Sequence, residues 1–495
     1  MQFVRPSEAI ETRRKKGERK LSFKQIAKGT ALIGFVNVVR LVAQLFSVPV
    51  LARLLSPADY GLAAMSMPVI LFVMMIADAG LSTSLVRSGK VDQPAWHTCF
   101  WLSVALGILF AIAVILLSPV VGFLASEPRL VPLITVLAAI IPLQTLTLVP
   151  GAALQQQKRF ATIAMAEIGS LVASIGAAVA CALAGFGVWA LIWQQIVFYI
   201  VRVMLTLACS PYRPRLIFDL PDAWEHVIFG RNLLGVALIT SASRAIENLA
   251  IGKINGPGAT GIYSMAFQFA RLPFMLVTGP LQYVLYPHIA AIREDKTKLA
   301  ALFLLFTRLL AMVVFPGVCL VALASEPMFH LLLSKKWEQA APIFVLIAPA
   351  AALQPVTSIV GTFLMALGRT EVQMRLAGQF AVLWLVGLML SVWYGIEAVA
   401  ATYSICGVLF SMWSLRICLP LVDCSFASYA RVFMWPVVLT VTAMIGYAML
   451  RSTSATHDVL NVCLSLALAA SVCVVGLFAQ RRALLAVLTK SDSIT

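Results

Sequence analysis

Charged residues are scarce in this chain of 495 residues, and acidic ones are the scarcest. Only 12% of the residues are charged and 61% are hydrophobic, which excludes a soluble globular protein. Asp and Glu number 21 against 37 Lys and Arg, so the net charge is +16. Much of this excess lies in Arg13–Gly29, just before the first apolar run. That position favours contact with anionic lipid headgroups over nucleic acid.

Paired cysteines, clustered histidines and catalytic motifs are also missing. The nine Cys and five His residues are dispersed, so we expect no disulfide framework, no metal site and no cofactor. The chain contains no G-x-S-x-G, no H-E-x-x-H and no phosphate-binding glycine loop. Long loops are absent too, and the largest external one spans 324–339. These absences disfavour a membrane glycosyltransferase or glycan ligase, the enzyme alternative.

Long apolar runs are abundant, and each is near the twenty residues that cross a bilayer. They predict an all-α polytopic membrane protein with two six-helix lobes and two C-terminal helices. The predicted spans are 31–50, 62–83, 98–118, 129–150, 163–184, 187–208, 232–251, 264–287, 301–324, 340–364, 376–394, 397–417, 431–450 and 459–479. The predicted domains are a basic tail (1–29), an N-lobe (30–209), a linker (210–230), a C-lobe (231–418), the last two spans (419–480) and a second tail (481–495).

The distribution of basic residues predicts the orientation of these spans. Most Lys and Arg lie in the two tails and in the even-numbered loops. The odd-numbered loops hold only Arg53, Arg129, Lys253, Lys335, Lys336 and Arg451. Loops rich in Lys and Arg stay in the cytoplasm. We therefore expect both termini to be cytoplasmic, in a multi-pass protein of the bacterial inner membrane.

An internal duplication is visible at a distance of two hundred residues. The stretch Ile251–Met265 aligns with Leu51–Met65 without a gap, which places Gly261 on Gly61 and Pro257 on Pro57. A later set, from Gln144 to Arg159, is repeated from Gln354 to Arg369. Ordered repeats of this kind indicate a duplicated transporter, with its substrate path between two related halves.

Polar residues inside the spans predict the substrate site. Asn37, Arg40 and Gln44 share one helical face in the first span, and Gln268 and Arg271 share another in the eighth. Arg244 lies in the seventh span. Only Arg40, Arg244, Arg271 and Arg308 are counted as Lys or Arg inside spans. Because a guanidinium group binds phosphate in a bidentate way, these residues predict a site for an anionic substrate.

Two alternatives to this site remain open. In the first, a carbonyl or carboxylate of a neighbouring helix binds Arg40, which then has a structural role. In the second, Glu247, three residues later, neutralises Arg244. The few carboxylates in or near spans, Asp78, Glu167 and Glu247, are candidates for binding a coupling ion. Asp78 and Glu167 lie near predicted cytoplasmic ends, where a salt bridge with Arg87 or Lys158 is the competing interpretation.

Four segments in order resemble the polysaccharide transporter family of the multidrug/oligosaccharidyl-lipid/polysaccharide exporter superfamily. They are KGTALIGFVNVVRLVAQLFSVPVLARLLSPADYGLAAM (28–65), DAGLSTSLVRSG (78–89), ALQQQKRF (153–160) and GFGVWALIWQQ (185–195). The likeness runs from about residue 24 through the twelfth span.

The resemblance implies translocation of undecaprenyl-pyrophosphate-linked oligosaccharide repeat units, for exopolysaccharide or lipopolysaccharide synthesis. It also implies alternating access and a partnership with polymerase or export machinery. A multidrug exporter of the same superfamily is the nearest rival, but a basic cavity would repel cationic drugs. The sequence does not specify the glycan, the coupling ion, the sugar-binding residues or the oligomeric state.

Overall fold

Every regular element in the described part of the chain is helical. The computed structural model describes residues 34–78, 94–217, 235–272, 295–453 and 458–479, with a few isolated residues between them. Within these ranges, eleven helices are long and apolar enough to cross a membrane. The prediction of an all-α polytopic membrane protein is therefore confirmed.

The helices follow the predicted spans closely. The first helix is Gly34–Leu54. It is followed by α2 (Pro57–Asp78), α4 (Pro94–Leu124), α5 (Leu130–Leu137), α6 (Ile140–Gln156), α7 (Phe160–Leu183), α8 (Trp189–Cys209), α10 (Gly235–Ala270), α12 (Lys296–Leu323), α13 (Ser325–Leu333), η2 (Lys335–Trp337), α14 (Ala340–Ala366), α15 (Thr370–Ser391), η3 (Val392–Tyr394), α16 (Ile396–Leu421), α17 (Phe426–Thr453) and α18 (Asp458–Ala479).

Helix α10 contains the seventh predicted span and the start of the eighth. Its backbone leaves the helical region at Gly256, with φ 86° and ψ 165°, a conformation that glycine adopts without steric cost. The next helical segment begins at Pro257, because proline suits the first turn of a helix. The predicted start of the eighth span at residue 264 is therefore wrong. Residues 276–287, the rest of the predicted eighth span, lie outside the described residues.

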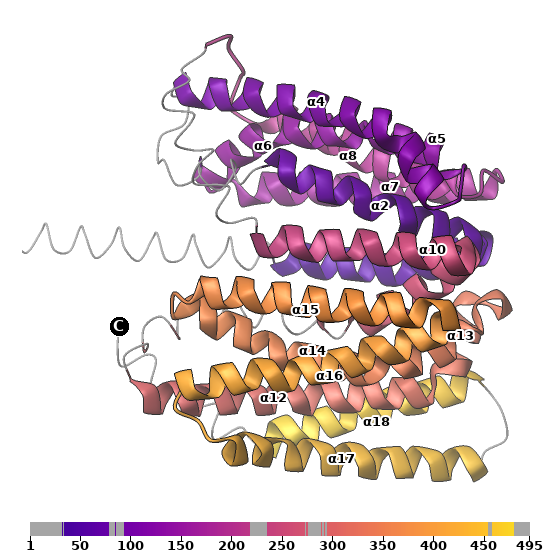
Figure 1. The fold of residues 1–495 in the computed structure, drawn as a ribbon, viewed down its shortest axis with the longest axis vertical. Coiled ribbons are helices and arrows are strands. Elements are labelled where there is room, and N and C mark those ends of the chain that lie inside the picture. The colour runs from indigo at the N-terminus through magenta and orange to yellow at the C-terminus, as the bar shows by residue number, and fades with distance from the viewer. Residues whose placement is uncertain are drawn as a thin grey trace, which may run out of the picture. The chain divides into compact units, whose positions relative to one another are not determined.

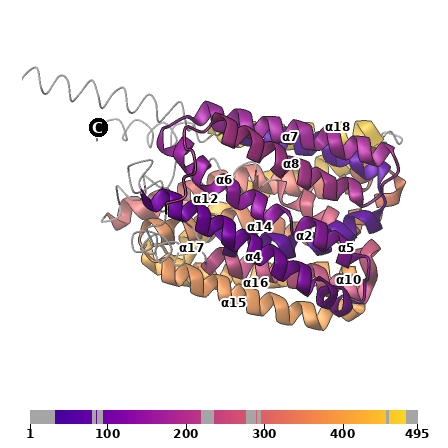
Figure 2. The same ribbon diagram turned by 90° about the horizontal axis from the view of Figure 1, so that it is seen from above.

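The chain divides into two compact units. The first contains residues up to 51, 70–120 and 131–235, and the second contains 52–69, 121–130 and 236–495. In the first unit, α8 packs against both α6 and α7, and α7 and α8 run side by side (Figure 2). The opening turns of α2 thus belong to the second unit, although they precede the N-lobe helices in sequence.

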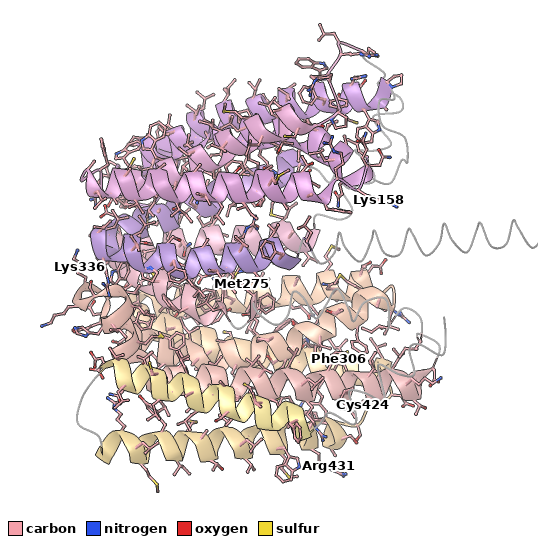
Figure 3. All side chains as sticks on the ribbon, turned by 180° about the vertical axis from the view of Figure 1, so that it is seen from behind. Lys158, Met275, Phe306, Lys336, Cys424 and Arg431 are labelled. Carbon is pink, nitrogen blue, oxygen red and sulfur yellow. The ribbon has the colours of Figure 1, made fainter. Side chains whose placement is uncertain are left out.

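The second unit is built around α12 and α14. Helix α12 packs against α14, α17 and α18, while α16 packs against α14 and α15 (Figure 1). Its core contains Phe303, which lies edge-on to Phe363 and stacks with Tyr429. In this unit, Lys336 and Cys424 lie at opposite ends of the helices (Figure 3). Their positions agree with the predicted alternation of loops between the two membrane faces.

The two duplicated glycines lie against each other in the second unit. A Cβ atom built on Gly61 would overlap the carbonyl oxygen of Pro257, and one built on Gly261 would overlap that of Pro57. The contact is reciprocal, since each glycine meets the proline that lies four residues before the other glycine. Small residues allow two membrane helices to approach this closely. The repeat seen in the sequence is therefore a pseudo-symmetric helix crossing in the structure.

The turn between the first helix and α2 is fixed to η2 and the end of α13. The Trp337 indole donates a hydrogen bond to the Ala52 carbonyl at 2.9 Å, and its ring meets Tyr60 edge-on at 5.2 Å. The Arg53 guanidinium donates to the carbonyls of Leu331 and Leu332. These bonds place the turn on the second unit, at the end that the charge pattern predicts to be external.

The start of the predicted linker is docked on the first unit. Tyr212 is buried, and its hydroxyl lies 3.0 Å from Nδ1 of His97 and donates to the Trp96 carbonyl. The Trp101 indole donates to the Arg215 carbonyl at 2.9 Å. The structure describes this linker only as far as Ile217.

This docking predicts that trypsin cuts the linker slowly after Arg215. The backbone there accepts a hydrogen bond from Trp101, and backbone held in hydrogen bonds enters a protease poorly. The check is mass spectrometry of fragments from cytoplasm-exposed membrane vesicles. Tyr212→Ala, which removes the buried anchor, should expose Arg215. Early cleavage at Arg215 in the parental chain would contradict the docked arrangement.

Candidate functional site

A polar cavity of about 380 Å³ lies within the second unit, among α10, α14, α15 and α16. Ligand pockets are generally of about 300–1,000 Å³. Its polar and aromatic lining comprises Thr240, Ser243, Arg244, Glu247, Phe274, Gln354, Thr357, Ser358, Thr362, Gln373, Phe380, Trp384, Tyr403, Phe410, Ser411 and Ser414. Polar side chains in a membrane-spanning helix face protein or a water-filled space, because lipid leaves them unsatisfied. This cavity is therefore the candidate site in this unit.

Glu247 is the buried centre of one wall. It is 1% exposed, although it is an acidic residue in a spanning helix. The Tyr263 hydroxyl donates to one carboxylate oxygen at 2.8 Å. Arg244 and the Trp384 indole each donate to the other oxygen at 3.4 Å. Three donors therefore satisfy the carboxylate, as burial of a charge requires.

Arg244 is held on two sides. Its guanidinium carbon lies 3.8 Å from the centre of the Phe267 ring, a cation–π contact, and its Nη1 pairs with Glu247. Arg271, the residue that follows the last residue of α10, interacts electrostatically with both Arg244 and Glu247. The cluster therefore contains two guanidinium groups and one carboxylate. The pairing anticipated at a spacing of three residues is present, and one positive charge remains in excess.

A charge swap separates the two roles of this pair. In Arg244→Glu with Glu247→Arg, the salt bridge is restored, but the guanidinium is moved away from the Phe267 ring. The exchange also leaves the Tyr263 and Trp384 donors without their acceptor, so transport is compared per molecule of chain in the membrane. We expect it to fall at least about tenfold. That loss corresponds to removing one charge-assisted contact of about 1.5–3 kcal/mol. Full transport by the swapped chain would identify Arg244 as a structural partner of Glu247.

The first unit contains a second arginine cluster. Glu167, on α7, forms ion pairs with Arg40 of the first helix and with Arg202 of α8, the latter at 3.5 Å. The alternative in which Arg40 is satisfied by a neighbouring carboxylate therefore describes this structure. Glu167 pairs with these two residues because α7 packs on α8. Arg87, one expected partner of the acidic residues, lies outside the described residues, and Lys158 forms no ion pair with Glu167 among the residues described.

Arg202 is the residue that the sequence analysis missed. It lies inside the predicted span 187–208, and Arg416 lies inside 397–417, so the count of four Lys and Arg inside spans was wrong. The position of Arg202 within an apolar run was the signal that could have identified it. Trp384 and Tyr403 gave no such signal, because aromatic residues are common in the packed faces of spans.

The other predicted site residues are less tightly placed. Asn37 is exposed, Gln44 and Gln268 are half-buried, and Asp78 is the last residue of α2. Arg40 belongs to the first unit, whereas Arg244 and Arg271 belong to the second. A common cavity for all three arginines stays a prediction. In the described residues, no group of three or more His, Cys, Asp or Glu side chains is arranged to hold a metal.

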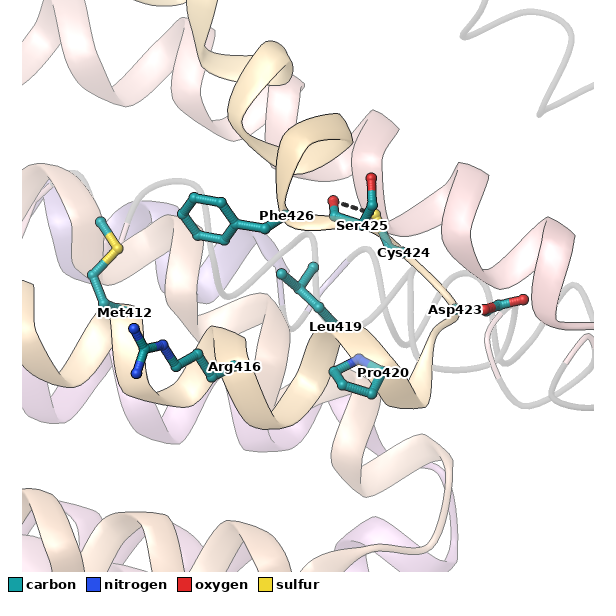
Figure 4. A pocket seen from close by; sticks show the side chains of 8 residues that line it. All are labelled: Met412, Arg416, Leu419, Pro420, Asp423, Cys424, Ser425 and Phe426. Carbon is teal, nitrogen blue, oxygen red and sulfur yellow. Dashed lines mark hydrogen bonds between the residues drawn. The ribbon is translucent and has the colours of Figure 1, made fainter.

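A second hollow, of about 710 Å³, lies at the turn that joins α16 to α17. Its lining includes Arg416, Asp423 and Phe426. Arg416 and Asp423 point away from each other across it (Figure 4). It opens at an end of the helices rather than among them, so we take the polar cavity as the candidate site.

Comparisons with known proteins place the chain in a family. A model described as "Polysaccharide biosynthesis protein" matches residues 50–342, more than half of the chain. The chain is 27% identical over 342 residues to "Lipopolysaccharide biosynthesis protein WzxC" of Escherichia coli (strain K12), covering 67% of this chain and 68% of that one. It is 28% identical over 304 residues to "Succinoglycan biosynthesis transport protein ExoT" of Rhizobium meliloti (strain 1021), covering 61% of each chain.

A third relative and two solved structures extend the likeness. "Teichuronic acid biosynthesis protein TuaB" of Bacillus subtilis (strain 168) is 24% identical over 423 residues, covering 84% of this chain and 87% of that one. The structure titled "Lipid II flippase MurJ, inward closed conformation" matches with a TM-score of 0.75 at 11% identity, covering 92% of this chain and all of that one. An inward-facing multidrug resistance MATE family transporter matches with a TM-score of 0.64 at 14% identity, covering 79% and 99%.

At these identities the solved structures establish the fold alone. The family model covers the first helix's end, α2 to α13 and the linker, which include both arginine clusters except Arg40. The sequence relatives are polysaccharide biosynthesis and transport proteins. The chain therefore belongs to the polysaccharide biosynthesis protein family, and it is a membrane transporter and not an enzyme.

Proposed function

We propose that this protein moves undecaprenyl-pyrophosphate-linked oligosaccharide repeat units from the cytoplasmic to the periplasmic leaflet of a bacterial inner membrane. The observation that carries the proposal is the charge of the two membrane-embedded clusters. Each has two arginines against one carboxylate: Arg40 and Arg202 with Glu167, and Arg244 and Arg271 with Glu247. A pyrophosphate head complements such an excess, since guanidinium groups bind it through charge-assisted hydrogen bonds.

Alternating access is the mechanism we propose for this movement. The chain is a duplicated transporter, and rocking of two related halves exposes a central path to each side in turn. The arginines would hold the charged head while the prenyl chain stays in lipid. Undecaprenyl pyrophosphate would thus cross without its charge entering the hydrocarbon, where a charge costs at least about 2.5–3.5 kcal/mol.

The proposal includes coupling of transport to an ion, with Asp78, Glu167 and Glu247 as the candidate sites. Glu167 and Glu247 are both engaged by arginine, which supports a role in positioning guanidinium groups. Asp78 and both glutamates stay predictions as coupling-ion sites. We also propose two kinds of partner. They are the polymerase or export machinery, and anionic lipid at the basic tail.

The rival function is multidrug export, suggested by the fold shared with a MATE transporter. Cationic drugs require an accessible carboxylate, and the one that lines the cavity, Glu247, already accepts three hydrogen bonds. We therefore favour an anionic, glycan-bearing substrate.

A deletion strain tests the proposed function. Lipid-linked repeat units should accumulate on its cytoplasmic leaflet and disappear when the parental gene is returned. Unchanged lipid-linked pools, together with increased sensitivity to cationic drugs, would favour the rival.

The proposed orientation has its own test. In a chain whose nine native cysteines are replaced, Ala455→Cys should react with an impermeant thiol reagent applied to spheroplasts, and Ser491→Cys should not. The reason is that basic tails remain in the cytoplasm. Labelling at both positions, or at neither, would contradict two cytoplasmic termini.

A further inference from the structure

We propose that the polar cavity of the second unit is a subsite for the sugar residues of the transported glycan. The inference rests on the proposed function and adds to it a place where uncharged sugar is bound, on the wall formed by α14, α15 and α16, beside the Arg244 that would hold the charged head. Its basis is the combination of unpartnered amides, hydroxyl acceptors and aromatic rings around one membrane-embedded space.

The amides of Gln354 and Gln373 are the first feature. Both line the cavity, and neither has a hydrogen-bond partner among the side chains and backbone that the structure describes. The Gln373 amide lies beside Gly361, where a methyl group would contact it at 3.4 Å. Each amide offers two N–H donors and one carbonyl acceptor. A sugar hydroxyl, which both donates and accepts, matches such a group.

The hydroxyl groups supply a complementary set of acceptors. Ser358, Ser411 and Ser414 donate to carbonyls of their own helices at 2.6, 2.7 and 2.9 Å. Their protons are thereby committed, and their remaining lone pairs are available on the cavity side. Such groups accept hydrogen bonds from a ligand rich in hydroxyls, and they are poorly suited to a ligand that offers acceptors only.

Aromatic rings form the apolar part of the wall. Trp384 meets Tyr403 edge-on with centroids 5.0 Å apart, and Phe380 meets Phe410 at 4.8 Å. Specific sites typically combine such apolar surface with a few placed polar groups. A pyranose ring has the same character, because its C–H faces are apolar while its edges carry hydroxyls.

The charge of the cavity excludes a cationic ligand. The ionisable acid and base that line it, Glu247 and Arg244, are paired with each other. The carboxylate accepts from three donors, so a cation finds no open acceptor there. Neutral sugars pay little desolvation cost in such a space when each hydroxyl finds a partner.

The test compares two substrates in proteoliposomes that contain the full-length protein. One is the complete lipid-linked repeat unit, and the other is the same lipid pyrophosphate bearing a single sugar. Gln354→Ala and Gln373→Ala should each slow transport of the complete unit by about three- to tenfold, the effect of losing one neutral hydrogen bond. Transport of the single-sugar lipid should stay within about twofold of the parental rate.

Gln379→Ala is the matched control. Gln379 lies on α15 with Gln373, but it accepts a hydrogen bond from Trp413 and is not among the cavity-lining residues. It should leave both rates unchanged. If the glutamine variants fail to fold, Ser411→Ala is a milder second variant. It should slow transport of the complete repeat unit and leave transport of the single-sugar lipid unchanged.

Three results would overturn the subsite. Equal loss for both lipids would assign the amides to the transport cycle, and no loss for either would remove the cavity from the sugar path. Greater loss for the single-sugar lipid would assign the two amides to the charged head instead of the sugars. Failure of the proposed function looks different, since the parental protein would then move neither lipid.

Discussion

Gly61→Ala and Gly261→Ala will each lower the thermal stability of the protein by several degrees and reduce its level in the membrane. The methyl group of either alanine would overlap a backbone carbonyl of the facing helix, Pro257 or Pro57. Backbone cannot move aside as a flexible side chain does, so the two helices must separate. Overpacking of this kind costs about 1–3 kcal/mol. The check is the melting temperature of the purified protein, with the amount in membranes measured alongside.

Gly258→Ala provides the matched control for this crossing. Gly258 lies on the same helical segment as Gly261, and nothing lies within 4 Å of the position its methyl would occupy. Alanine there should be neutral or slightly stabilising, because glycine is the weaker helix former by about 0.5–1 kcal/mol. The combined change Gly61→Ala with Gly261→Ala should cost less than the sum of the two, since one separation relieves both overlaps. Equal stability of all three single variants would refute the close crossing.

The second large effect concerns the arginines. Arg40→Ala, Arg244→Ala and Arg271→Ala will each abolish most transport while the protein stays in the membrane. Loss of one charge-assisted contact is worth about 1.5–3 kcal/mol, or about tenfold or more in binding. Arg→Lys will preserve part of the activity if charge alone matters. It will fail as Ala does if bidentate geometry matters, because an ammonium group is a point charge.

Arg202→Ala belongs to the same series. Because Arg202 shares Glu167 with Arg40, its removal leaves that cluster neutral, and we expect a loss similar to that of Arg40→Ala. Arg416→Ala is the control, since Arg416 is exposed near the end of α16, outside both clusters. The idea is falsified if all the cluster variants export glycan at the parental rate from normal membrane levels.

The apolar runs and the internal duplication in the sequence predicted much of the fold. The apolar runs predicted the spans, and the duplication predicted that Gly61 and Gly261 are equivalent. It did not predict that they touch, because contact between equivalent positions depends on how two helices cross. The start of the eighth span was missed at Pro257, since its hydropathy is low there and the signals were a glycine able to adopt positive φ and a proline.

The candidate site was only partly predictable. Arg244 and Glu247 are three residues apart on one helix, so their pairing followed from helix geometry alone. The pairing of Arg40 with Glu167 joins helices that are far apart in sequence, and only packing determines it. The cavity around Gln354, Gln373 and Trp384 is formed by separate helices in the same way. Sequence reasoning identified the charged residues except Arg202, whereas the neutral lining required the structure.

The most direct measurement is transport by the purified protein in vesicles. Proteoliposomes would carry the lipid-linked repeat unit in one leaflet, and the arrival of its sugars in the other leaflet would be followed with an impermeant lectin. We predict movement that depends on the protein, far above that of protein-free vesicles, and near the protein-free rate for Arg244→Ala. Movement no faster than in protein-free vesicles, by a protein that melts cooperatively, would contradict the proposed function.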